Sequence, residues 1–174
     1  MRPCLRVLFV VMILAVFPVL AVSWQSHEHK FSFDVPDSGW SDMGAVREGI
    51  LREGVVEFSS TNGSIFTVSC FPYRVEEGWE LNKARKTAET TLSMIKAAVG
   101  DVWHIGEEGE CRVNGVYGYH QEISFLYGGQ VYSAIIVVLA KNDTHYRLVY
   151  SWPGEIYHTG FWDYRKLIAS FKIQ

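Results

Sequence analysis

"SAIIVVLA", residues 133–140, is the stretch that decides the fold, because apolar side chains occupy successive positions along it. Neighbouring residues of a strand point to opposite faces of a sheet, so a strand that is apolar throughout is covered on both faces. Turn-forming pairs bracket the stretch, with Gly128 and Gly129 before it and Asn142 and Asp143 after it. The pattern therefore predicts a central strand that tight hairpins join to its neighbours.

Shorter or alternating apolar runs on either side of this stretch predict further strands. They lie at residues 30–36, 45–51, 55–60, 64–71, 102–106, 109–113, 116–127 and 144–152. Two further turn-forming pairs separate neighbouring strands, Glu53-Gly54 and Asn114-Gly115. Between Trp79 and Val99 the apolar residues recur at spacings of three and four, which is typical of an amphipathic helix, and Gly100 ends the pattern. Residues 157–173 predict a second helix. Its inward stripe comprises Phe161, Tyr164, Leu167, Ile168 and Phe171.

These elements predict the fold class, because a strand that is buried on both faces needs a covering layer on each side. We therefore expect an α+β fold, in which an antiparallel sheet of about six to seven strands is flanked by helices on both faces as an α/β/α sandwich. The register of the last three strands stays open, since a slip by one residue exchanges every side chain between the two faces.

The N-terminus carries an apolar run, Val7–Val22, after a short positively charged start. The run is short for a membrane-spanning helix, which needs roughly 20 apolar residues. Ala21 and Ser23 place small residues where a signal peptidase needs them. We therefore expect residues 1–23 to be a cleaved signal peptide and residues 24–174 to be a single extracytoplasmic domain, periplasmic or secreted. The alternative is an uncleaved anchor. The first residues of the mature chain, up to about Glu28, are expected to be loose.

The charge of the chain argues against two classes of partner. Its net charge is −3 at pH 7, and no run of basic residues occurs in it. Nucleic acids and anionic membranes both repel a negative surface, so neither is an expected partner. Contact with the membrane is expected only through the transient signal peptide.

The cysteines are interpreted from the predicted compartment. Cys4 would leave with the signal peptide, so that Cys70 and Cys111 remain. An even pair of cysteines in an oxidising compartment favours a structural disulfide. The alternative is that both are buried thiols. A redox function is not indicated, because no Cys-x-x-Cys spacing is present.

Several segments together resemble the PsbP-like domains. "FSFDVPDSGW" at residues 31–40 is similar to the start of that family, and "YRLVYS" at residues 146–151 is followed by a helix that ends in Ser170 and Phe171. The similarity lies in the order and spacing of elements and spans Lys30 to Ile173. It implies an α/β/α sandwich and non-enzymatic docking to a larger assembly. The family includes extrinsic subunits of photosystem II, a Ran-binding nuclear-import factor and bacterial exported proteins, and no determinant specific to a photosystem or to Ran occurs here.

Two histidines near the predicted mature N-terminus are the candidate metal ligands. His27 and His29 flank Glu28, and two imidazoles at this spacing can bind zinc or copper if further ligands complete the site. No such ligand spacing is visible elsewhere in the sequence. We interpret His27 and His29 as solvated side chains and expect no metal and no cofactor.

A catalytic site is not indicated by the sequence. His120, Glu122 and Ser124 fall on one face of a predicted strand, and His145 and Arg147 lie on a nearby strand that would allow them to join this group. A solvated sheet face would show the same pattern. No Gly-x-Ser-x-Gly motif is present, and the mature cysteines are predicted to be paired, so we expect a protein that is not an enzyme.

The aromatic residues suggest an interaction surface. The chain contains 6 Trp, 9 Tyr and 10 Phe, and both Trp and Tyr combine apolar area with a polar tip, which suits interfaces. The interface candidates are Trp40, Trp79, Tyr119 and Trp152. We therefore expect an exported accessory or assembly protein that binds a protein partner at the cell envelope. The alternative function is binding of a small ligand or a metal, and the oligomeric state stays open.

Overall fold

The computed structural model describes residues 22–36, 39–46, 54–72, 78–141, 143–155 and 159–174. Almost all of the predicted signal peptide, residues 1–21, lies outside the described residues, as do Glu53 and Asn142 of two predicted turns. In the part that is described, no helix combines the length and the apolar character that a membrane crossing needs.

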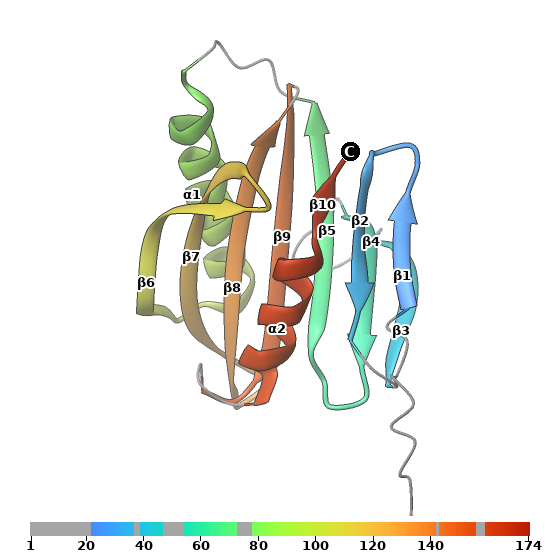
Figure 1. Ribbon diagram of the computed structural model, residues 1–174. Coiled ribbons are helices and arrows are strands. Elements are labelled where there is room, and N and C mark those ends of the chain that lie inside the picture. Colours follow the sequence, from blue (N-terminus) through green and yellow to red (C-terminus); the bar gives the residue numbers. More distant parts are fainter. Residues whose placement is uncertain (1–21, 37–38, 47–53, 73–77, 142, 156–158) are drawn as a thin grey trace, which may run out of the picture.

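Among the described residues, seven antiparallel strands form the main sheet in the spatial order β3-β4-β5-β9-β8-β7-β6 (Figure 1). These strands are β3 (Trp40–Val46), β4 (Gly54–Ser60), β5 (Ile65–Pro72), β6 (Val102–Val113), β7 (Val116–Tyr127), β8 (Gln130–Lys141) and β9 (Thr144–Pro153). The predicted antiparallel sheet and its approximate strand number are thus confirmed. The predicted strands at 102–106 and 109–113 are one strand, β6, whose register shifts between His104 and Glu108.

The hairpins of the sheet are closed by the turn residues that the sequence indicates. Asn114 and Gly115 join β6 to β7 with φ angles of 46° and 88°, and Gly128 and Gly129 join β7 to β8 with φ angles of 59° and 82°. Positive φ at both central residues matches the right-handed twist of the flanking strands. The turns fix the register, so that Ile136 of β8 lies opposite Gln121 of β7 and Val149 of β9.

Helix α1 (Glu80–Val99) packs on one side of the main sheet. Its buried residues Ala84, Ala88 and Ile95 form a core cluster with Ile136 and Val138 of β8. The helix follows the predicted apolar spacing and ends at Gly100, whose N–H donates to the carbonyl oxygen of Lys96 at 2.9 Å.

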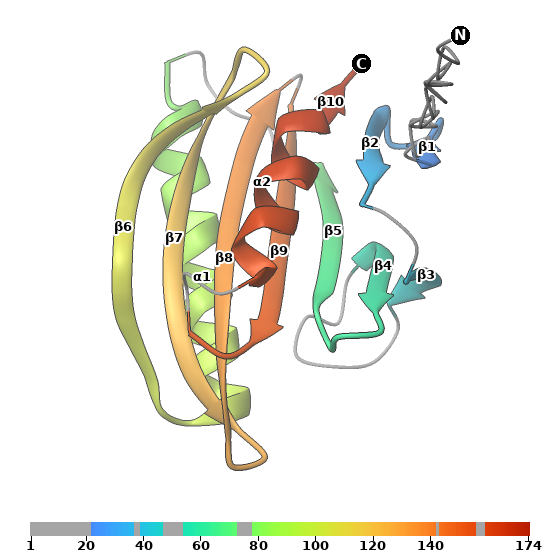
Figure 2. The same cartoon turned by 60° about the horizontal axis from the view of Figure 1, so that its bottom comes forward.

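Helix α2 (Thr159–Ser170) contributes to a different core cluster. Leu167 of α2, and Phe171 just after it, pack with Ile135 and Val137, the residues of β8 that alternate with those facing α1. In Figure 2, α1 lies behind strands β6 to β8, whereas α2 lies in front of β8 and β9. The predicted inward stripe of α2 is confirmed, because all five of its residues belong to this cluster or pack against it.

A second sheet, which the sequence did not predict, lies beside α2. It has the order β1-β2-β10 and consists of β1 (Val22–Ser26), β2 (Phe31–Val35) and β10 (Lys172–Ile173). The prediction of loose residues up to Glu28 is wrong for β1, because the ring of Trp24 lies 5.5 Å from those of Phe31 and Phe33. Two buried phenylalanines thus give the N-terminal strand an apolar surface to pack on.

Candidate functional site

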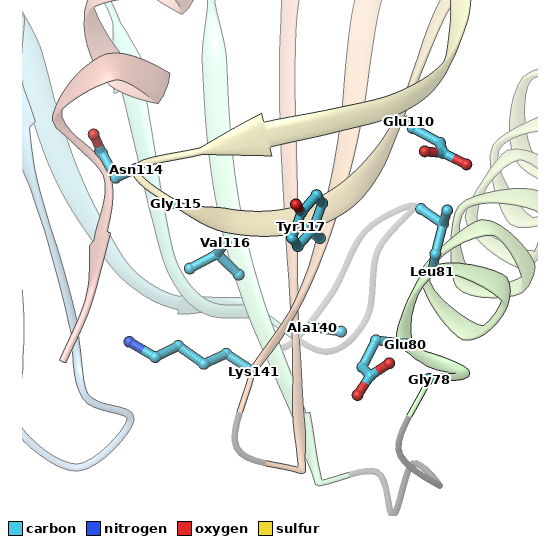
Figure 3. A pocket seen from close by; sticks show the side chains of 10 residues that line it. All are labelled: Gly78, Glu80, Leu81, Glu110, Asn114, Gly115, Val116, Tyr117, Ala140 and Lys141. Atoms are coloured by element: carbon cyan, nitrogen blue, oxygen red, sulfur yellow. The ribbon is translucent and has the colours of Figure 1, made fainter.

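A groove of about 620 Å³ opens between the start of α1 and the hairpin of β6 and β7 (Figure 3). Its lining residues are Gly78, Glu80, Leu81, Glu110, Asn114, Gly115, Val116, Tyr117, Ala140 and Lys141. The groove therefore combines the N-terminal turn of one helix with the ends of three neighbouring strands. We call this surface the aromatic groove, because Tyr117 lies at its centre.

Local contacts fix the position of Tyr117 in the aromatic groove. Arg112 lies directly opposite Tyr117 in the register, and its guanidinium carbon is 4.7 Å from the centroid of the Tyr117 ring. The Nε of Arg112 also donates to the carbonyl oxygen of Gly115 at 3.2 Å. The tyrosine side chain is nevertheless 59% exposed, so its ring is oriented by the protein while much of its surface meets solvent.

The far wall of the aromatic groove is tied to the C-terminal segment. The side-chain nitrogen of Asn114 donates to the carbonyl oxygens of Ala169 at 3.0 Å and Phe171 at 2.7 Å. Lys141 donates through Nζ to the carbonyl oxygen of Ile173 at 2.9 Å. These bonds join the hairpin and the end of β8 to the residues around the end of α2, and so hold the groove in shape.

Two of the sequence-predicted interface residues are sequence neighbours of residues that line this groove, although neither belongs to the lining. Trp79 stands between the lining residues Gly78 and Glu80 and is 54% exposed. Tyr119 follows Tyr117 on the same face of β7 and packs half-buried against the core cluster of α1. Burial raises the pKa of Tyr119 above its ordinary value, and the nearby Glu108 carboxylate adds to the rise.

The other two interface candidates do not form part of the aromatic groove. Trp152 is a core residue, only 1% exposed, and its Nε1 donates to the carbonyl oxygen of Glu155 at 3.0 Å. Its identification as an interface residue is therefore wrong, because the chain itself covers the ring. Trp40 is half-buried and packs on the α2 side of the sheet, with its ring 6.0 Å from that of Tyr150.

The predicted disulfide is absent from the structure. Cys70 on β5 and Cys111 on β6 are both free thiols, and strands β9, β8 and β7 lie between them. A disulfide needs the two Cα atoms within about 7 Å, whereas four strand spacings amount to about 19 Å. The alternative interpretation of two buried thiols fits the structure, in which both side chains pack against the core.

The histidines do not assemble into a metal site in the described part of the chain. No group of three or more His, Cys, Asp or Glu side chains there is arranged to hold a metal ion. His27 is exposed in the turn between β1 and β2, and His29 is half-buried with its Nε2 3.9 Å from a carboxylate oxygen of Glu28. These two residues therefore remain solvent-facing neighbours without a third ligand among the described residues.

The polar residues of β7 and β9 are divided between the two faces of the sheet. His120 lies in one row with Val137 and Leu148, on the α2 side, whereas Arg147 is in register with Val138 on the α1 side. The hypothesis that His145 and Arg147 join His120, Glu122 and Ser124 is therefore wrong. The register places the two groups on opposite sides of one layer of backbone.

Sequence reasoning missed three residues that shape the aromatic groove. Tyr117 was one aromatic residue among many on the last strands, and the carboxylates of Glu80 and Glu110 belong to elements that are far apart in the sequence. The Asn114-Gly115 turn was the available signal, because it places the first residues of β7 at the tip of a hairpin, where part of each side chain stays in solvent.

Sequence comparison finds no relative of this chain: no family model matches it, and no curated protein matches it. Solved structures do match its fold. Cyanobacterial PsbP (CyanoP) from Synechocystis sp. PCC 6803 gives a TM-score of 0.66 at 14% identity, over 92% of this chain and 96% of that one. The Saccharomyces cerevisiae Ran-binding protein Mog1p gives 0.59 at 9% identity, over 88% and 95%.

Two further structures extend the comparison. LpqN, which is involved in cell envelope biogenesis of Mycobacterium tuberculosis, gives a TM-score of 0.56 at 9% identity, over 84% of this chain and 86% of that one. A protein of Bacteroides thetaiotaomicron gives 0.59 at 14% identity, and the present chain spans only 48% of its length. The predicted PsbP-like resemblance is thus confirmed as a PsbP-like fold, and at these identities the likeness shows the fold alone.

Proposed function

We propose that the protein is an exported binding module that acts, without catalysis, as an accessory or assembly partner at the cell envelope. The observation that carries the proposal is the exposure of two aromatic side chains, Tyr117, which lines a concave surface, and Trp79, which stands between two of its lining residues, each more than half exposed. Burying aromatic rings of this size in a partner supplies much of the free energy of a protein interface. We take the fold as the predicted α/β/α sandwich, in which the α1 layer presents the groove.

The charges of the aromatic groove indicate which kind of side chain a partner would place in it. Glu80 and Glu110 contribute carboxylates, and the only described cationic residue in the lining, Lys141, donates to a backbone carbonyl. Leu81 and Tyr117 add apolar area between the carboxylates. The groove therefore suits a partner segment that combines a lysine or arginine with an apolar side chain.

Two features outside the groove support the proposal. The names of the structural neighbours describe Mog1p as Ran-binding and LpqN as involved in cell envelope biogenesis. The apolar run Val7–Val22 is of the kind that directs a chain out of the cytoplasm. Taken together, the two features support an exported domain of this fold that works through contacts with other proteins.

The test compares complexes isolated from the envelope of the native host. The wild-type chain is expected to co-elute with a second, discrete polypeptide. The native mass of the complex should equal the sum of the two chains. The double variant Trp79→Ala/Tyr117→Ala should lose that polypeptide. The matched control is Trp162→Ala, which removes an equally exposed tryptophan from α2, on the other side of the sheet. Loss of the polypeptide from both variants, or from neither, contradicts the proposal.

A small-ligand carrier is the second candidate function, and the volume of the groove favours it. A cavity of about 620 Å³ lies within the range of small-molecule sites. A native mass that contains the chain and a compound of low mass, with no second polypeptide, would replace the first proposal with this one.

A further inference from the structure

Strand β6 forms one border of the main sheet. Among the described residues it pairs only with β7, and in Figure 2 no described helix or strand lies beyond it. An edge strand presents a row of backbone N–H and C=O groups that can pair with a strand of another chain. The outer edge of β6 is therefore a surface on which a partner segment can form backbone hydrogen bonds.

The register shows which backbone groups of β6 point outward. The two-residue turn at 114–115 makes its flanking residues, Val113 and Val116, a hydrogen-bonded pair, and such pairs alternate with non-bonded pairs along an antiparallel ladder. The residues of β6 in non-bonded pairs have their N–H and C=O groups directed away from β7. They are Glu108, Glu110 and Arg112.

A bulge limits the length of the regular edge. The register shifts between His104 and Glu108, and the intervening Glu107 donates its backbone N–H to a carboxylate oxygen of Glu122 at 3.3 Å. A bulge interrupts the ladder and bends the strand. The regular edge therefore runs from Glu108 to Val113, which gives room for a partner segment of about five residues.

The three outward residues carry their side chains on the α1 side of the sheet. Glu110 lies opposite Tyr119, which packs against the core cluster of α1, and Glu108 and Arg112 share its face because they are two residues away. All three side chains are exposed. Glu110 also lines the aromatic groove, so a strand that pairs with β6 would direct alternate side chains toward that groove.

The cations near this edge already have partners within the chain. Arg112 donates to the carbonyl oxygen of Gly115 and lies over the ring of Tyr117. The Nε of Arg85 on α1 lies 3.6 Å from a carboxylate oxygen of Glu89 in the same helix. Neither arginine is therefore paired with the carboxylates of the edge in these contacts.

The carboxylates of Glu108 and Glu110 give the edge its chemical preference. Glu108 accepts a hydrogen bond from the side-chain nitrogen of Gln121 at 2.8 Å, and an ionised carboxylate has further acceptor sites. Opposite charges on directly opposed residues stabilise a strand pair, and like charges destabilise it. A lysine or arginine opposite each carboxylate therefore suits this edge.

We propose that the partner of the aromatic groove binds through an extended segment of alternating basic and apolar residues, which adds as an antiparallel strand to the outer edge of β6. The inference rests on the proposed function, because Glu110 belongs to both surfaces. Backbone bonds supply affinity in this mode of recognition, and alternate side chains supply specificity. The basic residues lie opposite Glu108 and Glu110, and the apolar residues lie on the other face, beside Gly109 and Cys111.

Hydrogen exchange of the isotopically labelled full chain, followed by NMR, tests the pairing. The probe is the capped peptide acetyl-Val-Lys-Val-Lys-Val-amide. When it is bound, it should slow exchange of the outward amides of Glu108 and Glu110 about tenfold, because these N–H groups become hydrogen-bonded. The amides of Gly109 and Cys111, which already face β7, should change little.

Two methylated peptides separate backbone pairing from charge. In the proposed strand pair the lysine N–H groups point toward β6, whereas the N–H of the central valine points away from it. Methylation of both lysine backbone nitrogens should weaken binding about tenfold or more, since two hydrogen bonds are lost. Methylation of the central valine nitrogen, which leaves the same charges, is the matched control and should have little effect.

Charge removal from the chain supplies the second test. Glu110→Gln should weaken binding of the unmethylated peptide about threefold, because an exposed ion pair is lost while the backbone N–H remains. The control is Glu28→Gln, which removes the same charge from the exposed turn between β1 and β2. Equal effects of the two variants would overturn the proposal.

Three further results would also overturn it. They are unchanged exchange at Glu108 and Glu110, equal losses from the two methylated peptides, and protection of these amides in the chain alone that increases with its concentration. The last result would assign the edge to a second copy of the chain. None of these measurements uses the native polypeptide, whose loss from the Trp79→Ala/Tyr117→Ala variant tests the proposed function separately.

Discussion

Cys70 and Cys111 occupy one cross-strand row of the main sheet, with Tyr146, Leu139 and Gly118 between them in register. The two thiols therefore share a face of the sheet, yet they lie about 19 Å apart along the row, at four strand spacings. This relationship explains why a pair that looks like a disulfide in the sequence is two separate, half-buried thiols in the fold.

The state of the two thiols can be measured directly. Burial raises the pKa of Cys70 to about 12 and that of Cys111 to about 11, from an ordinary value of 9.0. The reactive thiolate is therefore scarce at neutral pH, and alkylation of the native protein should be slow and should accelerate as the pH rises. In denaturant without a reductant, both cysteines are expected to be labelled, as counted by intact mass. A mass two hydrogens light, with neither cysteine labelled, would contradict this prediction.

Gly118 should tolerate no side chain. A Cβ at this position would fall onto the backbone carbonyl oxygen of Val138 and would lie 2.7 Å from a methyl carbon of Leu139. We expect Gly118→Ala to lower the free energy of unfolding by about 1–3 kcal/mol, since neighbouring backbone must move to admit the methyl group. Chemical denaturation measures this loss. An unchanged denaturation midpoint would contradict the register of β7 against β8.

Two tryptophans that differ in burial should differ in their effect on stability. Trp79 is 54% exposed, so Trp79→Ala should change the free energy of unfolding by no more than about 0.5 kcal/mol. Trp152 is 1% exposed, so Trp152→Ala should cost about 3–5 kcal/mol. Denaturant titrations of the two variants side by side make the comparison. Similar losses in both would mean that Trp79 is part of the core.

His145 should make the stability of the fold depend on pH. Its pKa is lowered in the folded protein, so the unfolded chain binds the proton more readily. The contribution of the neutral histidine to the free energy of unfolding is therefore fully present above pH 6.5, its ordinary pKa. It is lost as the pH falls from that value toward the lower pKa of the folded protein. The described titratable groups that line the same cavity as His145 are Lys83, Lys86 and Arg147.

The variant His145→Asn isolates this contribution. It has no proton to gain, so the free energy of unfolding of the wild type should fall relative to that of the variant on acidification, as measured by denaturation at several pH values. A constant difference between the two proteins across the window would exclude a lowered pKa for His145.

The parts of the fold that depend on local patterns could be predicted from the sequence. Apolar spacing indicated α1 within one residue, and the Asn114-Gly115 and Gly128-Gly129 pairs indicated the long hairpins. The second sheet could not be predicted, because β10 has only two residues, Lys172 and Ile173, and pairs with β2 from the other end of the chain. Such non-local pairing leaves no periodic signal in the sequence.

The candidate site was predicted only in part. Trp79 was identified because it stands beside Gly78 at the start of the predicted helix. Trp152 was misassigned because an aromatic residue in a strand looks the same in sequence whether it is covered or not. Its covering residue, Gly160, lies in α2, where a Cβ would meet the Trp152 ring. The cysteine and histidine assignments failed for a related reason, since both depend on strand order and register, which periodicity does not specify.

Site-specific photocrosslinking in the native host tests the central claim, that the aromatic groove binds a protein partner, most directly. A photoreactive phenylalanine analogue replaces Tyr117 in one strain and Trp162 of α2, the equally exposed control on the other side of the sheet, in another. The proposal predicts one discrete polypeptide crosslinked from position 117, lost when Trp79→Ala is added, and not obtained from position 162. No crosslinked polypeptide at position 117, or the same product from both positions, would contradict it.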